Sequence, residues 1–516
     1  MSGEEANRDH KTIAIIGGGV AGLCAGCYAQ MNGYKATIYE MHSLPGGVCT
    51  AWQRNGYTVD SCIHWLVGSG PASGFHKLWK EVGALKGLKI VDLDEFMRVE
   101  CKGSPALVFY RDVDRLERHL LELGPEDAKP IRELTNAIRK FTRFDMPVDK
   151  APELYTLWDR LVMGARMMPL GPAFMKWRKV TIVDFAKRLK SPVLRDALGA
   201  MVGESADFPM LGLIMMLAWQ EMKTAGYPLG GSLPFVRNIE KRFRDLGGQV
   251  RYTARVEKIL VEAHPDGRAA RAVGVHLADG TEHHADVVIS AADGRSTIFD
   301  MLGGRYADDG VRKPYEGGMT PFAPLLYVGL GIADPLEGIP QVGSGISFPL
   351  DPSVEIDGKV RDRLSMMVYN FDRALAPAGK TMVIVSISAD YDRWKTLRDD
   401  PVRYRAEKEL AAERVIDALE QRLPGIRAKV EMRDVATPVT WERYTGNWRG
   451  SYEGWLPTGQ SLGKGMSKTL PGLDGFYMIG QWVAPGGGLP PAVSTARHVV
   501  QILCKKDGRR FIATEE

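Results

Sequence analysis

The sequence predicts an α/β fold in which a parallel-sheet domain carries a second, mixed α+β domain. Three observations predict it. A glycine motif near the N-terminus stands between a strand pattern and a helix pattern, and a second glycine-rich loop opens a helix near the C-terminus. The long segments between these loops mix helical and strand-like patterns. The 516 residues, 45% of them hydrophobic, are ample for two or more domains.

The first predicted element is a strand–turn–helix–strand unit. Residues 12–16 form a short apolar, β-branched run, which predicts a buried strand. A G-x-G-x-x-G motif at residues 17–22 follows directly. A helical pattern over residues 21–30 and a second strand pattern over residues 35–39 come next, and Glu40 follows that strand.

The spacing of this unit is that of a Rossmann-like dinucleotide-binding turn. Gly17 allows the tight turn, Gly19 lets the backbone approach a pyrophosphate, and Gly22 lets the helix pack closely on the strand. The helix N-terminus presents free N–H groups and its positive dipole end to the phosphates. Glu40 stands where a ribose-binding acid is expected, which favours FAD or NAD over NADP.

Cys24 and Cys27 form a C-x-x-C pair inside the predicted helix. Such a pair can be redox-active. We favour the interpretation that both are small apolar residues packing the helix on the sheet, because free cysteine is commonly buried.

Charge and cysteine content narrow the class of protein. The formal net charge of +4 is small for this length, and the sequence has no dense basic stripe, so we expect no nucleic-acid partner. The N-terminus, MSGEEANRDHK, is polar and mixed in charge, and six cysteines are few for a secreted chain. We therefore expect a cytoplasmic location, or a peripheral one on the cytosolic face of a membrane. Residues 12–34 are uncharged and long enough to span a bilayer, but their glycines argue against a spanning helix.

A glycine pair, Gly46-Gly47, follows Glu40 closely, and the next stretch contains GYTVD at residues 56–60 and HWLVG at residues 64–68. A glycine pair allows another backbone segment to approach a bound ligand. With these features the sequence resembles the two-dinucleotide-binding-domain flavoproteins, and specifically the superfamily of phytoene desaturases, carotenoid isomerases and retinol saturases. The resemblance implies that the dinucleotide is FAD.

Three later blocks carry the same resemblance in the same order. A PLGG turn at residues 228–231 precedes a helical pattern and a strand whose Val256 the resemblance places at the adenine. Residues 285–294 resemble the strand that closes the family's FAD domain, and residues 480–491, GQWVAPGGGLPP, resemble its C-terminal flavin loop. N–H groups at the start of the following helix can stabilise negative charge on the flavin ring. We expect both glycine loops to serve one FAD.

The residues expected to bind FAD come from these blocks. They are Gly17, Gly18, Gly19, Val20, Ala21, Gly22, Glu40, Met41, Gly46, Gly47, Val48, Thr50, His64, Trp65, Val256, Ala291, Gly480, Gln481, Gly487, Gly488, Leu489 and Pro490. Val48 departs from the family, which often has Arg there, and Gln481-Trp482 is closer to the isomerase and saturase branch than to the bacterial desaturases. His64 is a candidate catalytic acid or base, with a hydrogen-bonded structural role as an equal alternative.

The FAD-binding domain is expected to combine residues 1–75, 225–300 and 455–516. The substrate-binding cap would combine residues 76–224, mostly helical in pattern, with residues 301–454, which mix strand patterns and a charged helix.

One cap segment, residues 157–180, combines Met and Trp with Arg and Lys. Flexible Met suits an adaptable apolar tunnel, and basic residues with Trp suit a lipid headgroup surface. A helical core with a solvated basic face is the alternative. Superfamily members that act on carotenoids bind membranes peripherally, so a membrane surface is a possible partner.

The resemblance implies an FAD-dependent oxidoreductase that acts on carbon–carbon bonds of a lipophilic polyene or isoprenoid. Desaturation, saturation and cis–trans isomerisation are variants of one hydride exchange with flavin N5. A flavin amine oxidase-like enzyme and a non-catalytic, flavin-binding lipid escort remain alternatives. The sequence has no metal-spaced Cys/His cluster and no second G-x-G-x-x-G, so we expect no metal and an electron partner such as oxygen, a quinone or a separate reductase.

Overall fold

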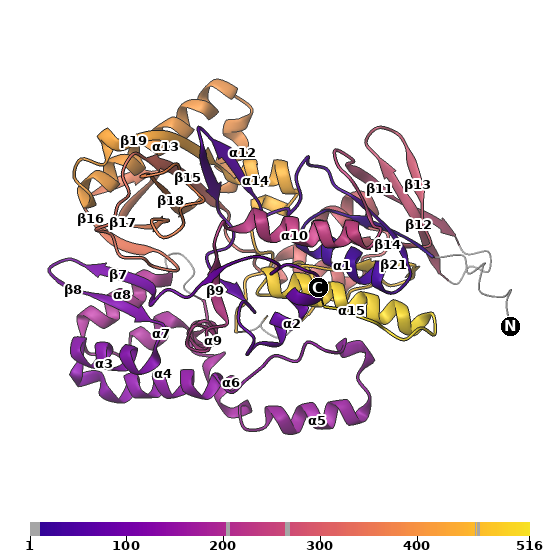
Figure 1. The fold of residues 1–516 in the computed structure, drawn as a ribbon, viewed down its shortest axis with the longest axis horizontal. Helices are drawn as coiled ribbons and strands as arrows, with labels where there is room; N and C mark the ends of the chain where they lie inside the picture. Colours follow the sequence, from indigo (N-terminus) through magenta and orange to yellow (C-terminus); the bar gives the residue numbers. More distant parts are fainter. Residues whose placement is uncertain (1–10, 203–206, 264–268, 460, 462–464, 516) are drawn as a thin grey trace.

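The computed structural model describes residues 11–202, 207–263, 269–459, 461 and 465–515. The polar N-terminal segment, from which we expect no signal peptide, falls largely on residues 1–10, outside the described part. Figure 1 shows one half in which the first and last parts of the chain lie together, and a cap half with an upper sheet and a lower helical group.

A five-stranded parallel sheet forms the centre of the first half, in the order β10-β2-β1-β14-β21. Its strands are β1 (Thr12–Ile16), β2 (Lys35–Tyr39), β10 (Gln249–Arg251), β14 (Val287–Ser290) and β21 (Phe476–Met478). Ile13 and Ile15 face one apolar core, and Ala14 and Ile16 face another, as the alternation of a strand requires. These five strands come from the three segments expected to form the FAD domain, whose exact boundaries stay a prediction.

Three helices from distant parts of the chain cover one face of this sheet. They are α1 (Val20–Met31), α10 (Ser232–Asp245) and α15 (Leu489–Lys506). Helix α1 contacts both of the others and lies between them (Figure 1). Neither Cys24 nor Cys27 forms a disulfide and both are fully buried in α1, so the packing interpretation is confirmed. Helices α1 and α10 approach each other closely, since a Cβ at Gly26 would lie 2.7 Å from a ring carbon of Phe243.

The other face carries a second layer, in which β11 (Val256–Ala263), β12 (Ala270–Leu277) and β13 (Glu282–His284) are antiparallel and the short β20 (Leu473–Asp474) pairs with β12 in parallel. The sequence pattern of residues 473–480 predicts a single strand, and this prediction is wrong, because the structure has two short strands there. Gly475, with φ of 69°, turns the chain, so residues 473–474 pair with β12 and residues 476–478 pair with β14.

The cap is built on a seven-stranded mixed sheet, in the order β19-β15-β18-β17-β16-β7-β8. Its strands are β7 (Glu95–Cys101), β8 (Ser104–Tyr110), β15 (Leu325–Ile332), β16 (Ile346–Ile356), β17 (Lys359–Val368), β18 (Thr381–Ser388) and β19 (Val430–Ala436). Helices α12 (Tyr391–Arg398) and α13 (Pro401–Arg422) bury Trp394, Val415 and Ile416 against it. The β7–β8 hairpin lies in the region expected to be mostly helical, because it extends a sheet whose other strands come more than 200 residues later.

A helical group completes the cap. Its helices are α3 (Val113–Leu123), α4 (Ala128–Phe141), α5 (Leu157–Met167), α6 (Gly171–Trp177), α7 (Ile182–Ala186), α8 (Pro192–Val202) and α9 (Met210–Glu221). Helix α9 is buried in this group, whereas α5 has no buried residue. Shorter elements connect the halves: β3 (Ala51–Arg54), β4 (Tyr57–Asp60), β5 (Leu66–Val67), α2 (Gly74–Glu81), β6 (Ile90–Val91), β9 (Ala225–Pro228), α11 (Asp309–Lys313) and α14 (Pro438–Thr445). In the described residues no helix has both the length and the apolar character of a membrane span.

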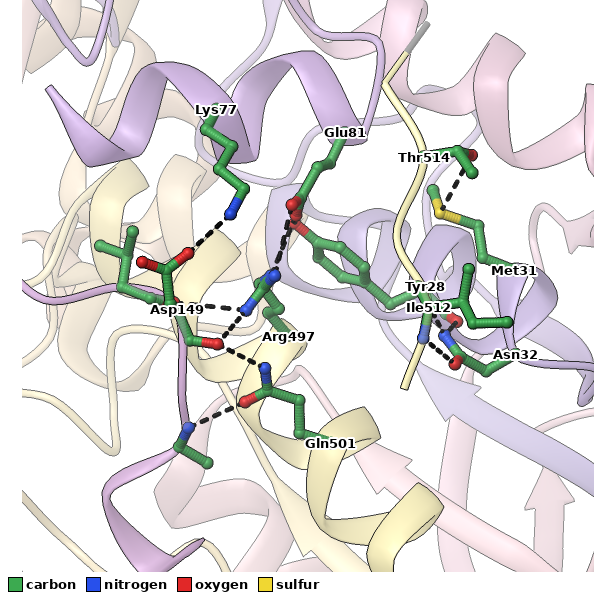
Figure 2. Close-up of polar contacts among 12 residues, drawn as sticks. Tyr28, Met31, Asn32, Lys77, Glu81, Asp149, Arg497, Gln501, Ile512 and Thr514 are labelled. Atoms are coloured by element: carbon green, nitrogen blue, oxygen red, sulfur yellow. Dashed lines mark hydrogen bonds and ion pairs between the residues drawn. The ribbon is translucent and has the colours of Figure 1, made fainter. Parts of the chain in front are cut away.

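A buried ion pair fastens α15 to the rest of the molecule (Figure 2). The Arg497 guanidinium on α15 lies 2.9 Å from the Glu81 carboxylate at the end of α2, and their side chains are 6% and 3% exposed. Tyr28 of α1 donates to the same carboxylate, and Arg497 also donates to the Asp149 carbonyl of the cap. One arginine therefore joins four segments of the chain.

Candidate functional site

In the front glycine turn, protein atoms crowd the space around Gly22 and leave the space around Gly19 open. A Cβ at Gly22 would lie 2.0 Å from the Gly17 carbonyl oxygen, so close helix–strand packing requires this glycine. A Cβ at Gly19 would meet nothing nearer than 3.7 Å, the carbonyl oxygen of Gly46. Gly19 is also the N-cap of α1 and supplies no side-chain cap, so the first N–H groups of the helix face this open space.

Glu40 follows β2 and lies against the glycine turn. Its carboxylate accepts hydrogen bonds from the Gly18 N–H at 2.6 Å and the His42 N–H at 2.7 Å. Burial raises the pKa of Glu40, and these N–H groups oppose the rise. A carboxylate has about four lone-pair positions, so Glu40 keeps capacity to accept hydroxyl groups.

The predicted glycine pair lies beside the front turn. The Gly46 N–H donates to the Gly18 carbonyl at 2.9 Å, and Gly46 and Gly19 form a parallel bridge. Gly46 and Gly47 have φ of 115° and 61°, a region that favours glycine. Val48 and Thr50 follow in the same turn, and Met41 reaches instead toward Gly446 of the cap.

The C-terminal loop meets the same turn from the other end of the chain. A Cβ on Gly480 would lie 3.4 Å from the Ala21 Cβ, and one on Gly17 would lie 3.4 Å from the Ala291 backbone. The start of β11 also lies here, because the Ala254 N–H donates to the Glu40 carbonyl, and Val256 is buried two residues later. The predicted front, middle and C-terminal residues therefore converge at the carboxyl edge of the parallel sheet.

Gln481 and Trp482 pack against the segment around residues 447–455 and not against the front glycine turn. The Gln481 carbonyl lies against Gly454, where a Cβ would be 2.7 Å away. The Trp482 side chain is buried and donates from Nε1 to Asn447 at 3.2 Å. Trp482 thus packs the loop onto the cap-side segment that precedes it, next to Trp455.

His64 and Trp65 lie on the cap-facing side of the site. Trp65 packs edge-on against Phe96 of β7, with ring centroids 5.2 Å apart. Burial lowers the pKa of His64 to about 4, so its imidazole is neutral near pH 7. His64 and Trp65 border a cavity of about 10 Å³, which Gln220 and Tyr227 also line.

Three buried polar atoms of this region have no hydrogen-bond partner among the described residues. They are Thr50 Oγ1, Ser61 Oγ and His64 Nε2. Buried polar groups are normally paired, so such atoms indicate a place for a ligand. Together with the open space at Gly19, they fit a large polar and aromatic cofactor such as FAD. Around the described residues, no group of three His, Cys, Asp or Glu side chains is arranged to hold a metal ion.

Glu453 is a site residue that the sequence analysis missed. A Cβ on Gly487 would lie 1.9 Å from the Glu453 carbonyl oxygen, and one on Gly488 would lie 3.1 Å from its Oε1. Burial raises the pKa of Glu453 to about 7. A signal was present, since Glu453 is the only acid between residues 451 and 473, but no motif connects it to the glycine loop.

The fold and this site define a class of protein: an α/β protein with a dinucleotide cradle at the edge of a parallel sheet and a large mixed cap. The family model "Flavin containing amine oxidoreductase" matches residues 20–504, and the chain belongs to this family.

Curated relatives match over nearly the whole chain. The chloroplastic prolycopene isomerase of Daucus carota is 24% identical over 507 residues, which cover 94% of this chain and 78% of that protein. A lycopene-forming phytoene desaturase of a Paracoccus species is 24% identical over 514 residues, which cover 96% of this chain and 97% of that protein. Among solved structures, an oxidoreductase from Methanosarcina mazei superposes with a TM-score of 0.60 at 18% identity, covering 96% of this chain and all of that one.

Proposed function

We propose that this protein is an FAD-dependent oxidoreductase that acts on carbon–carbon bonds of a lipophilic polyene or isoprenoid, by desaturation, saturation or cis–trans isomerisation. The observation that carries the proposal is the convergence of the two glycine loops: Gly480 lies against Ala21 at the start of α1. The family is flavin-containing, and relatives at 24% identity are named as a prolycopene isomerase and a phytoene desaturase.

The chain's own residues have separable tasks in this proposal. The N-terminus of α1 and the open space at Gly19 would hold the pyrophosphate, and Glu40 would accept hydrogen bonds from the ribose. Gly480, Gly487 and Gly488 would let the backbone approach the flavin ring, with Leu489 and Pro490 behind them. A bound flavin would supply the two-electron chemistry, while the cap would hold the substrate away from water.

Two alternative functions use the same loops and differ from the proposal in substrate or in turnover. A flavin amine oxidase-like enzyme shares the cradle and the family, and would act on an amine. A lipid escort would bind flavin and lipid without turnover.

Product masses separate these functions. We would incubate the flavin-loaded protein with polyenes and retinoids, once with oxidised and once with anaerobically reduced flavin. We expect products that differ from the substrate by two hydrogens, or a new isomer at unchanged mass with reduced flavin. Peroxide release from an amine panel, with every polyene unchanged, would contradict the proposal, and no turnover of any compound would favour the escort.

We also propose that α5 is the surface that meets a membrane. Its apolar side chains lie on one helical face, with Leu157 81%, Trp158 72% and Leu161 67% exposed. The basic residues Arg160 and Arg166 flank this face. Figure 1 shows α5 at the lower edge of the molecule, away from the sheets. This exposure argues against a core position for α5, although Trp177 later in the same segment is buried in the core of the cap. It suits a helix that lies in the plane of a lipid interface.

Vesicle binding tests this surface. We expect the double substitution Trp158→Glu and Leu161→Glu to weaken cosedimentation with anionic vesicles by at least about tenfold, because two exposed apolar side chains would no longer enter the lipid. The matched control is Val402→Glu with Leu410→Glu on α13, which carries exposed apolar residues on the cap's outer helix. Equal binding of the α5 variant and the wild-type protein would contradict the proposal.

A further inference from the structure

Glu453 lies where the cap meets the C-terminal glycine loop. Its backbone is covered by Gly487, and its carboxylate lies beside Gly488, the N-cap residue of α15. The two backbones are in close contact, since any side chain at Gly487 would overlap the Glu453 carbonyl. The Glu453 side chain is half-buried, with Oε1 beside Gly488, and within the described residues its carboxylate has no hydrogen bond or ion pair.

The helix behind this loop supplies few donors of its own. We expected N–H groups at the start of α15 to stabilise negative charge on a flavin ring. Pro490 and Pro491 occupy the second and third positions of α15, and proline has no N–H. The first turn of α15 therefore lacks two of the donors that an ordinary helix N-terminus offers. A protonated carboxyl group beside Gly488 can supply a donor in their place.

Two tyrosines interact with Glu453, and one of them, Tyr327, also interacts with Asp60, whose pKa burial raises to about 6. Tyr452 precedes Glu453 in the chain, and Tyr327 of β15 interacts electrostatically with Glu453, Asp60 and Cys62. Burial raises the pKa of both tyrosines, so they are neutral near pH 7. The Asp60 carboxylate accepts hydrogen bonds from the Ser232 N–H and hydroxyl and from the Cys62 N–H, and so it is turned toward α10.

We propose that Glu453 is the proton-exchanging group of the flavin site: it is a neutral donor while the ring is reduced and a carboxylate while the ring is oxidised. This inference rests on the proposed function, which places FAD at the loop. Negative charge added to the ring acts on a carboxyl group as a like charge and favours its protonated form. The charge change at Glu453 would thus follow the redox state of the ring.

The proton balance of this coupling is explicit. When dithionite reduces the bound flavin, the ring takes two electrons and one proton and keeps one negative charge. The Glu453 carboxylate takes a second proton from solvent and becomes the acid. Reoxidation releases both protons and both electrons. Burial sets the pKa of Glu453 to about 7 before reduction, so the second proton is taken up from about pH 7 upward and not at lower pH, where the acid is already protonated.

The test is an anaerobic reductive titration of the FAD-loaded protein in weak buffer with a pH indicator. We expect the wild-type protein to take up as much as one more proton per flavin than Glu453→Gln above about pH 7. The difference should be small at about pH 6, because Glu453 is then mostly protonated before reduction and the glutamine carries no charge. The control is Glu355→Gln on β16, an exposed acid of the cap, which should match the wild-type protein.

The outcomes distinguish this inference from the proposed function. Equal proton uptake by wild type and Glu453→Gln at every pH, with FAD bound to both, overturns the role of Glu453 and leaves the flavin site standing. A wild-type protein that does not retain FAD overturns the proposed function itself. If Glu453→Gln does not retain FAD, the test is the proton uptake of the wild-type protein alone. Uptake per flavin that is constant with pH overturns the role of Glu453, and uptake that rises above about pH 7 supports that role.

Discussion

Replacing Gly19 with valine is expected to weaken FAD binding by at least about 100-fold, or about 2.8 kcal/mol, while the fold remains. The backbone at Gly19 has φ of −69° and ψ of 176°, which valine adopts without strain. A Cβ there meets no protein atom within 3.7 Å. The space at this position is unused by the protein, so a side chain would occupy the place expected for the pyrophosphate. Flavin content by absorbance and thermal unfolding of the apoprotein measure the two effects separately.

Substitutions at two other glycines are controls for this prediction. Gly22→Val should fail to fold, because its Cβ would lie 2.0 Å from the Gly17 carbonyl oxygen. Gly199 in α8 has nothing within 4 Å of a built Cβ, so Gly199→Val should retain FAD. Full flavin content in Gly19→Val would show that the pyrophosphate lies elsewhere.

Replacing Arg497 with methionine is expected to lower the free energy of unfolding by about 3–5 kcal/mol. The substitution leaves the Glu81 carboxylate buried, with only the Tyr28 hydroxyl as a donor at 2.8 Å. It also removes one of the two donors from α15 to the Asp149 carbonyl of the cap, and leaves only the Gln501 amide. Urea unfolding followed by tryptophan fluorescence would measure the change in midpoint.

Partial rescue identifies the buried charge as the cause. Adding Glu81→Gln to Arg497→Met should recover part of the loss, because no uncompensated charge then remains. The neighbouring pair Lys77–Asp149, shown in Figure 2, is the matched surface control: its side chains are 49% and 74% exposed. Lys77→Met should change stability by less than about 1 kcal/mol. If Arg497→Met also lowered the free energy of unfolding by less than about 1 kcal/mol, the ion pair would not be what holds α15 in place.

The local elements of this protein can be predicted from its sequence alone. The strand at residues 12–16, the helix after it and the strand at residues 35–39 follow from periodicity and glycine spacing, and the structure has them within two residues. The charged helix expected from residue 402 to 423 is α13. Such elements are readable because the side-chain pattern of one short segment suffices to specify them.

Only the tertiary structure decided the features that depend on segments far apart in the chain. The break at Gly475 arises because residues on either side of it pair with different sheets. The β7–β8 hairpin is a strand pair because β16, about 250 residues later, completes its sheet. The apolar face of α5 is exposed, and only the arrangement of the cap shows this, because an amphipathic pattern by itself does not say whether its apolar face is covered.

The candidate site divides in the same way. The glycines and Glu40 were found from the sequence, because a motif of fixed spacing holds them. Glu453 was not, because its place beside Gly487 and Gly488 is set by a contact across more than 30 residues and by the cap that buries it. A carboxyl group has its ordinary pKa until burial removes water from it, and burial is a property of the folded chain.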